Sequence, residues 1–174
     1  MGLAQALLPE FDQEMAGVRR TLERVPEEKF EWRPHPKSGT MGWLASHLAT
    51  LPGFAVRIVR TDLQEVTPGG QPPSGPPKLK TRQEVLDAFD SNRDAARAAI
   101  VGASDEHLMK TWTLLFRGKT VFAMPRADVL RHALMNHMIH HRAQLGVYLR
   151  MNEVPVPALY GPSADEQVSV GKGS

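Results

Sequence analysis

The chain has 174 residues, of which 41% are hydrophobic and 23% are charged, and its formal net charge is +2. These proportions are typical of one globular domain with a hydrophobic core, so we take residues 1–174 as a single domain. So small a charge does not indicate nucleic-acid binding, and the absence of cysteine excludes disulfides and thiolate ligands, so that any metal must bind nitrogen or oxygen.

The first ten residues contain no basic cluster and only a short apolar stretch, which is not the pattern of a signal peptide. No apolar run in the chain approaches the roughly 18 residues that a membrane span needs. Together with the lack of cysteine, these features lead us to expect a cytoplasmic protein with no membrane partner.

Two amphipathic helices are predicted in the first third of the chain, because apolar residues recur every three or four positions. The first helix ends near Pro26, and either Ser38 or Thr40 can cap the second. A kink is expected where Pro52-Gly53 interrupts the second helix. The two apolar stripes consist of Leu8, Phe11, Met15, Val18, Leu22 and Val25, and of Leu44, His47, Leu48, Leu51, Ala55 and Ile58.

Residues 67–80 are rich in proline and glycine and predict an extended linker. At about 3.1 Å per residue, such a segment reaches roughly 40 Å, whereas a helix of twenty residues is about 30 Å long. The linker can therefore cross the full length of a helical bundle and lets the second and third helices lie parallel.

A third helix is predicted to begin at Thr81, because Thr81-Arg82-Gln83-Glu84 has the pattern of a capping box. Residues 108–124 then change to β-branched and aromatic types around Arg117-Gly118-Lys119, which indicates a short hairpin-like excursion. Pro125 suits the first turn of a fourth helix, which we expect to end near Asn152. Residues 158–174 form a polar tail.

Three histidines lie within five positions of the predicted fourth helix. With about 100° of rotation per residue, His137 and His141 lie about 40° apart and both face the core. His140 falls about 60° to the other side, toward the rim, and His132 faces solvent. His47 occupies an inward position on the second helix. Three imidazoles that meet between helices can hold a divalent transition metal and leave one coordination position open.

The alternative is that these are hydrogen-bonded core histidines without a metal. A single inward histidine is more often of that kind, but a buried pair would leave ring donors and acceptors unsatisfied, which favours a metal. Positions 138 and 139 are Met and Ile, so the His-Glu-x-x-His pattern of zinc peptidases is absent.

Further candidate residues flank the histidines. Arg142 and Gln144 follow the pair directly, and Gln144 either hydrogen-bonds a ligand or substrate or serves packing. Tyr160 and Asp165 belong to a polar cluster that forms either a surface turn or a flap over the site. We keep Gln144, Arg142 and Tyr160 as candidate catalytic residues.

The chain resembles the DinB/YfiT-like superfamily of metal-dependent enzymes over nearly its whole length, except in the proline-rich linker. The resemblance depends on the order and separation of four segments, namely Trp32-Arg33-Pro34-His35-Pro36, Gly42-Trp43-Leu44-Ala45-Ser46-His47-Leu48-Ala49, His137-Met138-Ile139-His140-His141-Arg142-Ala143-Gln144-Leu145, and Val154-Pro155-Val156-Pro157-Ala158-Leu159-Tyr160-Gly161-Pro162-Ser163.

The resemblance implies an all-α four-helix bundle of up-down-down-up topology, with the linker as a long crossover between the second and third helices and the hairpin-like excursion before the fourth. It also implies a three-histidine site, carried here by His47, His137 and His141, for a divalent metal such as zinc or nickel. Relatives often form homodimers, and those of known activity include S-transferases and isomerases that use low-molecular-weight thiols.

The leading hypothesis is therefore a metal-dependent enzyme of the thiol S-transferase or hydrolase type, acting on a small-molecule substrate. The alternative is a non-catalytic, metal-stabilised binding or stress-response module, in which a fourth protein ligand would close the site. Nucleic-acid binding is a third reading, which we do not expect.

Overall fold

The computed structural model describes residues 2–71 and 75–167. Three residues of the predicted linker, 72–74, and the last seven of the predicted tail, 168–174, lie outside the described residues.

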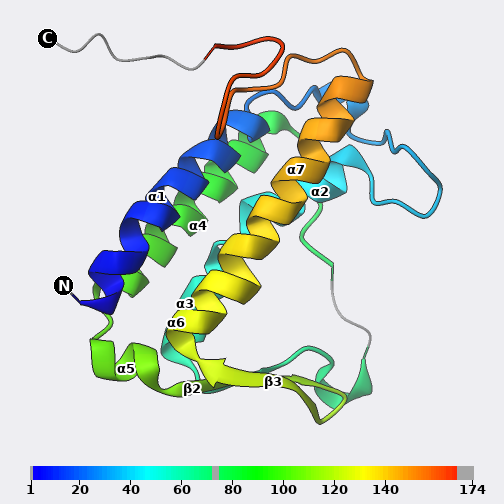
Figure 1. Ribbon diagram of the computed structural model, residues 1–174. Coiled ribbons are helices and arrows are strands. Elements are labelled where there is room, and N and C mark those ends of the chain that lie inside the picture. Colours follow the sequence, from blue (N-terminus) through cyan, green and yellow to red (C-terminus); the bar gives the residue numbers. More distant parts are fainter. Residues whose placement is uncertain (1, 72–74, 168–174) are drawn as a thin grey trace, which may run out of the picture.

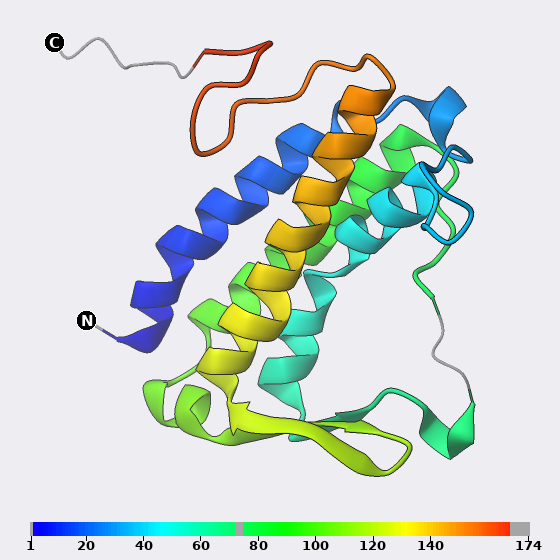
Figure 2. The ribbon, with the colours of Figure 1, turned by 45° about the vertical axis from the view of Figure 1, so that its right-hand side comes forward.

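The long helices lie side by side and surround the core (Figures 1 and 2). α1 packs on α4 and α7, and α2 packs on the same two helices. α1 and α7 run in one direction, while α2, α3 and α4 run in the other. The helices are α1 (Leu3–Leu22), α2 (Met41–Thr50), α3 (Gly53–Arg60), α4 (Arg82–Val101), α5 (Asp105–Met109), α6 (Arg126–Val129), the π-helical turn η3 (Leu130–Met135) and α7 (Asn136–Met151), with short 3₁₀ turns η1 (Glu27–Lys29) and η2 (Pro68–Gly70).

The helix boundaries follow the local signals in the sequence. Thr40 caps α2, since its hydroxyl accepts a hydrogen bond from the backbone N–H of Trp43 at 3.1 Å, and Thr81 caps α4 in the same way. At the expected kink, Leu51 and Pro52 separate α2 from α3, although both residues keep helical backbone angles. α6, η3 and α7 continue one another from Arg126, directly after Pro125, to Met151. The predicted starts of the third and fourth helices are thus confirmed.

The prediction of an all-α fold is wrong, because a three-stranded mixed sheet closes one end of the helices (Figure 1). β2 (Thr111–Phe116) and β3 (Lys119–Pro125) form an antiparallel hairpin, and β1 (Leu63–Glu65) pairs with β2 in parallel. The hairpin turns through Arg117 and Gly118, which both have positive φ, as a two-residue turn of this twist requires. β1 is only three residues long, and its pairing with a strand 50 residues later leaves no pattern in the local sequence.

Glu65 holds the hairpin turn against β1. Its carboxylate accepts hydrogen bonds from the backbone N–H of Arg117 at 3.1 Å and of Gly118 at 2.8 Å, and from Thr67. Because side chains alternate along a strand, Gln64 and Val66 point away from this clamp, toward the helices. β1 and the residue that follows it therefore present these two side chains to the space beside α3.

The sheet is joined to the helices through Arg126, whose side chain is 1% exposed. Its guanidinium donates hydrogen bonds of 2.9–3.1 Å to the main-chain carbonyls of Ile58, Thr61, Lys110 and Thr111. Two of these carbonyls lie at the end of α3, where a helix leaves its last carbonyls without partners. One buried cation thus holds the end of α3, the start of β2 and the start of α6 together.

The core between the helices is apolar and is built from the predicted stripes. Phe11, Met15, Val18 and Leu22 of α1 are at most 1% exposed, and each fully buried side chain of this size contributes about 1.5–3 kcal/mol. Leu8 is only partly buried, and Leu7 takes its place in the core. Among the described residues, none of the helices combines the length and the apolar character that a bilayer crossing requires.

Candidate metal centre

Three imidazole rings converge between α2 and α7. The Nε2 atom of His137 lies 3.4 Å from Nε2 of His47 and 2.7 Å from Nε2 of His141. One ligand nitrogen from each ring lies within 4.8 Å of the other two. The structure therefore brings together the three histidines selected from the sequence.

The local fold explains why the rings meet. His137 and His141 are one turn apart on α7, so both project from the same face toward α2. His47 lies in the last turn of α2, just before the break at Pro52. The π-helical turn η3 immediately precedes α7, and π turns of this kind often occur at functional sites because they re-aim the residues that follow.

A hydrogen bond to the outer ring nitrogen orients His141. Its Nδ1 lies 2.7 Å from Oε1 of Gln144 and must donate to it, since an amide oxygen only accepts. Burial lowers the pKa of His137, and hydrogen bonding by the main chain of Ala133, one turn before it, acts in the opposite direction and raises this pKa. The neutral ring of His141 therefore carries its proton on Nδ1 and directs its Nε2 lone pair into the centre.

Nε2 of His137 lies 2.7 Å from the Nε2 lone pair of His141, and a cation between the rings would bind lone pairs from both. Tetrahedral coordination with metal–nitrogen bonds of about 2.0–2.1 Å places neighbouring nitrogens about 3.3–3.4 Å apart. The His47–His137 distance already has this value, and the His137–His141 distance needs to open by about 0.6 Å. The donor set thus fits a divalent transition metal.

Electrostatics at the site keep the imidazoles neutral. Burial, together with the neighbouring rings of His141 and His137, lowers the pKa of His47 from its ordinary value of 6.5 to about 4. Burial is also the main cause that lowers the pKa of His137 and of His141. Neutral imidazole is the form that binds a metal, so the site is ready for one at neutral pH.

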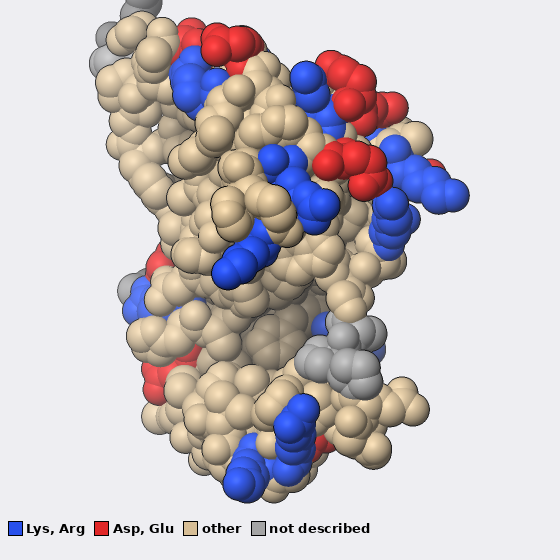
Figure 3. All heavy atoms as spheres, turned by 90° about the vertical axis from the view of Figure 1, so that its right-hand side faces the viewer, with Lys and Arg blue, Asp and Glu red and all other residues tan. Residues whose placement is uncertain are grey.

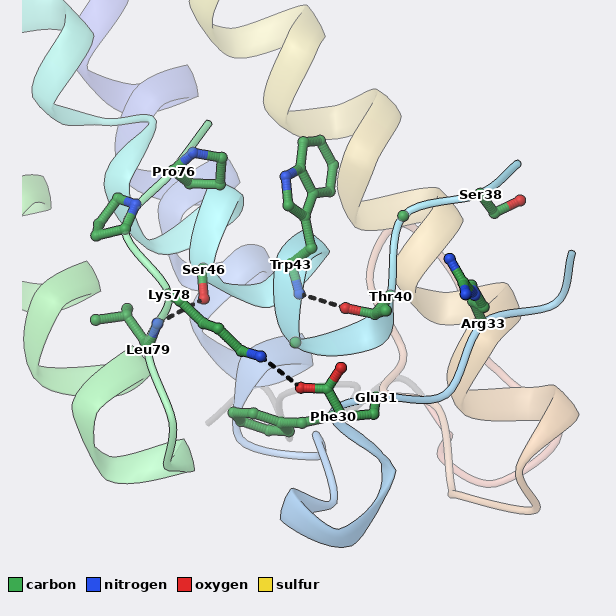
Figure 4. Close-up of a pocket in the computed structure, with 13 residues that line it drawn as sticks. Phe30, Glu31, Arg33, Ser38, Thr40, Trp43, Ser46, Pro76, Lys78 and Leu79 are labelled. Atoms are coloured by element: carbon green, nitrogen blue, oxygen red, sulfur yellow. Dashed lines mark hydrogen bonds and ion pairs between the residues drawn. The ribbon is translucent and has the colours of Figure 1, made fainter. Parts of the chain in front are cut away.

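Trp43 covers the histidines on the side of α2. Its indole stacks on His47, with ring centroids 5.1 Å apart and planes 19° from parallel, and meets His141 edge-on at 6.3 Å. Trp43 also lines a pocket of about 310 Å³, where its indole points away from the Glu31–Lys78 ion pair (Figure 4). The other neighbour, His140, is exposed, as the helical angles predicted.

Arg142 and Tyr160 are placed elsewhere and do not hydrogen-bond to the histidines. Arg142 is 3% exposed and forms an ion pair of 2.8 Å with Glu14 of α1, which is itself buried. The Tyr160 hydroxyl accepts from Arg142 at 2.5 Å and donates to Glu14 at 2.7 Å. Asp165 pairs with Arg150. These contacts hold the tail against α1 and α7, and of the three candidate catalytic residues only Gln144 contacts the metal centre.

A cavity opens from the histidines toward the sheet, and Figure 3 shows the hollow in this face of the molecule. Two adjoining pockets of about 500 and 490 Å³ share His47, Leu51, Arg57, Gln64 and Val66 in their walls. The second of them also contains His137. The candidate metal centre is therefore accessible from a space large enough for a small molecule.

Sequence reasoning did not select Arg57 and Gln64. Arg57 lies on α3, beyond the break at Pro52, and Gln64 lies on β1. The only local signal was the polar residue at position 57 next to the apolar stripe, and a single arginine at a helix surface is most often a solvated side chain.

Comparisons with known proteins identify the family and the fold of the chain. A sequence model of the DinB superfamily matches residues 10–145. The chain is 24% identical over 164 residues to YrdA, an uncharacterised protein of Bacillus subtilis, which covers 94% of this chain and 92% of YrdA.

Solved structures show the same fold at low sequence identity. A DinB-like protein of Bacillus cereus superposes with a TM-score of 0.70 at 21% identity, covering 90% of this chain and 97% of that one. The DinB-like protein YjoA of Bacillus subtilis superposes with a TM-score of 0.63 at 16% identity, covering 90% of this chain and 95% of YjoA. A mycothiol-dependent maleylpyruvate isomerase superposes with a TM-score of 0.59 at 15% identity, covering 82% of this chain and 60% of the isomerase.

Proposed function

This chain belongs to the DinB superfamily, and from that premise we propose that it is a metal-dependent enzyme of the thiol S-transferase or hydrolase type. His47, His137 and His141 hold the metal, which is zinc or nickel. The observation that carries the proposal is the convergence of three imidazole rings, of which His141 is oriented through its outer nitrogen by Gln144.

An enzyme, rather than a structural site, is favoured by the number of ligands. A structural zinc site is closed by a fourth protein ligand, whereas a catalytic site keeps one position open. In the described part of the chain, the group contains the three histidines and no carboxylate. When bound, a divalent metal supplies a Lewis acid that lowers the pKa of a water or thiol in the open position.

The remaining work is done by the residues around the histidines. Gln144 keeps the proton of His141 on Nδ1 and so keeps Nε2 free to bind. Trp43 packs against His47 and covers that side of the centre. The cavity beside His47 and His137 admits the substrate, which reaches the centre from the side of the sheet.

Thiol chemistry is supported by one relative. The mycothiol-dependent maleylpyruvate isomerase has the same fold, and its name identifies a low-molecular-weight thiol as part of its reaction. We therefore include thiols of this kind among the substrates to test. The homodimer predicted from the family stays a prediction, which sedimentation of the purified chain will test.

The test of the metal assignment is metal analysis of protein purified without a histidine tag. Wild-type protein is expected to contain close to one zinc or nickel per chain, and His47→Ala, His137→Ala and His141→Ala are each expected to lose it. His140→Ala is the matched control, because His140 is exposed and lies between His137 and His141 on the same helix. Unchanged metal content in the three ligand variants would refute the assignment.

A further inference from the structure

The cavity beside the metal centre contains one cation whose charge is not neutralised. Among the described residues that line its two pockets, Arg57 is the only lysine or arginine, and none is an aspartate or glutamate. Its guanidinium lies 5.9 Å from the Phe54 ring, and no ion pair of Arg57 is formed within the described part of the chain. By contrast, Arg19, Arg24, Arg93, Arg97, Arg126, Arg131, Arg142 and Arg150 all pair with carboxylates.

A second polar group in the same walls also lacks a partner. Oε1 of Gln64 is buried and accepts no hydrogen bond from the described residues. A buried acceptor without a donor costs free energy, so such a group is uncommon unless a ligand or water satisfies it. Glu65 clamps the neighbouring position of β1 to the hairpin, so the strand that carries Gln64 is held in place.

Another side of the cavity is apolar. Phe54, Leu114 and Phe122 line the pocket that also contains His137. Ligand sites commonly combine an apolar wall with a few polar groups that fix orientation. In this cavity the polar groups are the guanidinium of Arg57 and the amide oxygen of Gln64. The candidate metal ligands His47 and His137 line the same pocket.

We propose that this cavity binds a small monocarboxylate that carries an amide N–H and an apolar group, as an N-acyl amino acid does. Its carboxylate pairs with Arg57, its N–H donates to Gln64, and its apolar part packs on Phe54 and Phe122. A single guanidinium without a second cation matches one negative charge better than the two of a phosphate. The inference rests on the proposed function, because it names the substrate class of that same site.

The test compares two ligands that differ only in charge. Hippurate has a phenyl ring, an amide N–H and a carboxylate, and hippuramide replaces the carboxylate by a neutral amide. Arg57 is exposed, so calorimetric titration of the full chain, both zinc-loaded and chelator-treated, is expected to show hippurate binding about threefold to fivefold more tightly, the size of an ion pair with an exposed arginine. Arg57→Gln is expected to remove this preference and to leave hippuramide binding unchanged.

Arg60→Gln is the matched control, since Arg60 is exposed on the same helix and lines neither pocket. Gln64→Met is expected to weaken both ligands alike without lowering the melting temperature, because it removes an unsatisfied acceptor. A role of Gln64 in folding alone would instead lower the melting temperature.

Equal affinity of the wild type for the two ligands, absence of saturable hippurate binding, or a preference that survives Arg57→Gln would each overturn the inference. These results are separable from a failure of the proposed function. A preference for hippurate in a chain that holds no metal would leave the cavity assignment standing and refute the metal enzyme. A chain that binds metal but shows no preference for hippurate would refute the cavity assignment and leave the proposed metal enzyme standing.

Discussion

Replacement of Arg126 by leucine is expected to destabilise the protein strongly, because one side chain connects the sheet to the helices. The guanidinium donates to four main-chain carbonyls at 2.9–3.1 Å and is 1% exposed. Arg126→Leu leaves these carbonyls without their donor, at about 1 kcal/mol each. The additional ion pair with Asp62 contributes little, since that carboxylate is 94% exposed.

The expected loss is therefore about 3–5 kcal/mol, a large part of the roughly 5–15 kcal/mol that stabilises a typical domain. For a chain of this length it corresponds to a decrease of about 10 °C in the melting temperature. Urea unfolding followed by far-ultraviolet circular dichroism gives the free energy directly and shows whether the m-value is unchanged.

Arg131→Leu serves as the control, because Arg131 follows on the same helical run but its side chain is 51% exposed and pairs with Glu10. It is expected to lose less than about 1 kcal/mol. A loss of similar size in both variants, or one below about 1 kcal/mol for Arg126→Leu, would show that the buried guanidinium does not hold the sheet as we infer.

Three further predictions concern the site and its surroundings. Gln144→Leu is expected to weaken zinc binding by about 10- to 100-fold in a chelator competition, because it removes the hydrogen bond that orients His141. In chelator-treated protein, the free energy of unfolding is expected to fall as the pH decreases from 6.5 to about 4. In this range His47 is protonated in the unfolded chain but stays neutral in the folded chain, so protons stabilise the unfolded state. Arg142→Leu is expected to cost about 3–5 kcal/mol, because it leaves Glu14 buried and unpaired.

Each of these predictions has its own control. His140→Leu should leave the zinc affinity unchanged. Equal losses of zinc affinity in Gln144→Leu and His140→Leu would indicate a general effect on α7. A His47→Gln variant should reduce the pH dependence, since the lowered pKa values of His137 and His141 remain, and an unchanged slope would assign it to other groups. Combining Arg142→Leu with Glu14→Leu should recover part of the lost stability, whereas additive losses would argue against coupling of the pair.

The sequence by itself determined the features that depend on a few neighbouring residues. Thr81 and Pro125 define the starts of helices, and Pro52 breaks one, because capping and the missing N–H of proline act within a single turn. The spacing of His137 and His141 likewise defines a common face on a helix. These signals identified the three histidines of the candidate site before their rings were seen to converge.

Tertiary structure alone decided the rest, since those features depend on which distant segments meet. β1 forms only because β2 is beside it, and three residues of sequence cannot indicate a partner 50 positions away. Arg142 faces Glu14 rather than the histidines, and Arg57 and Gln64 become neighbours in one cavity only when α3 and β1 are assembled. Hydrogen bonds and charge pairs between remote segments leave no periodic pattern in the sequence, because their partners lie far apart along the chain.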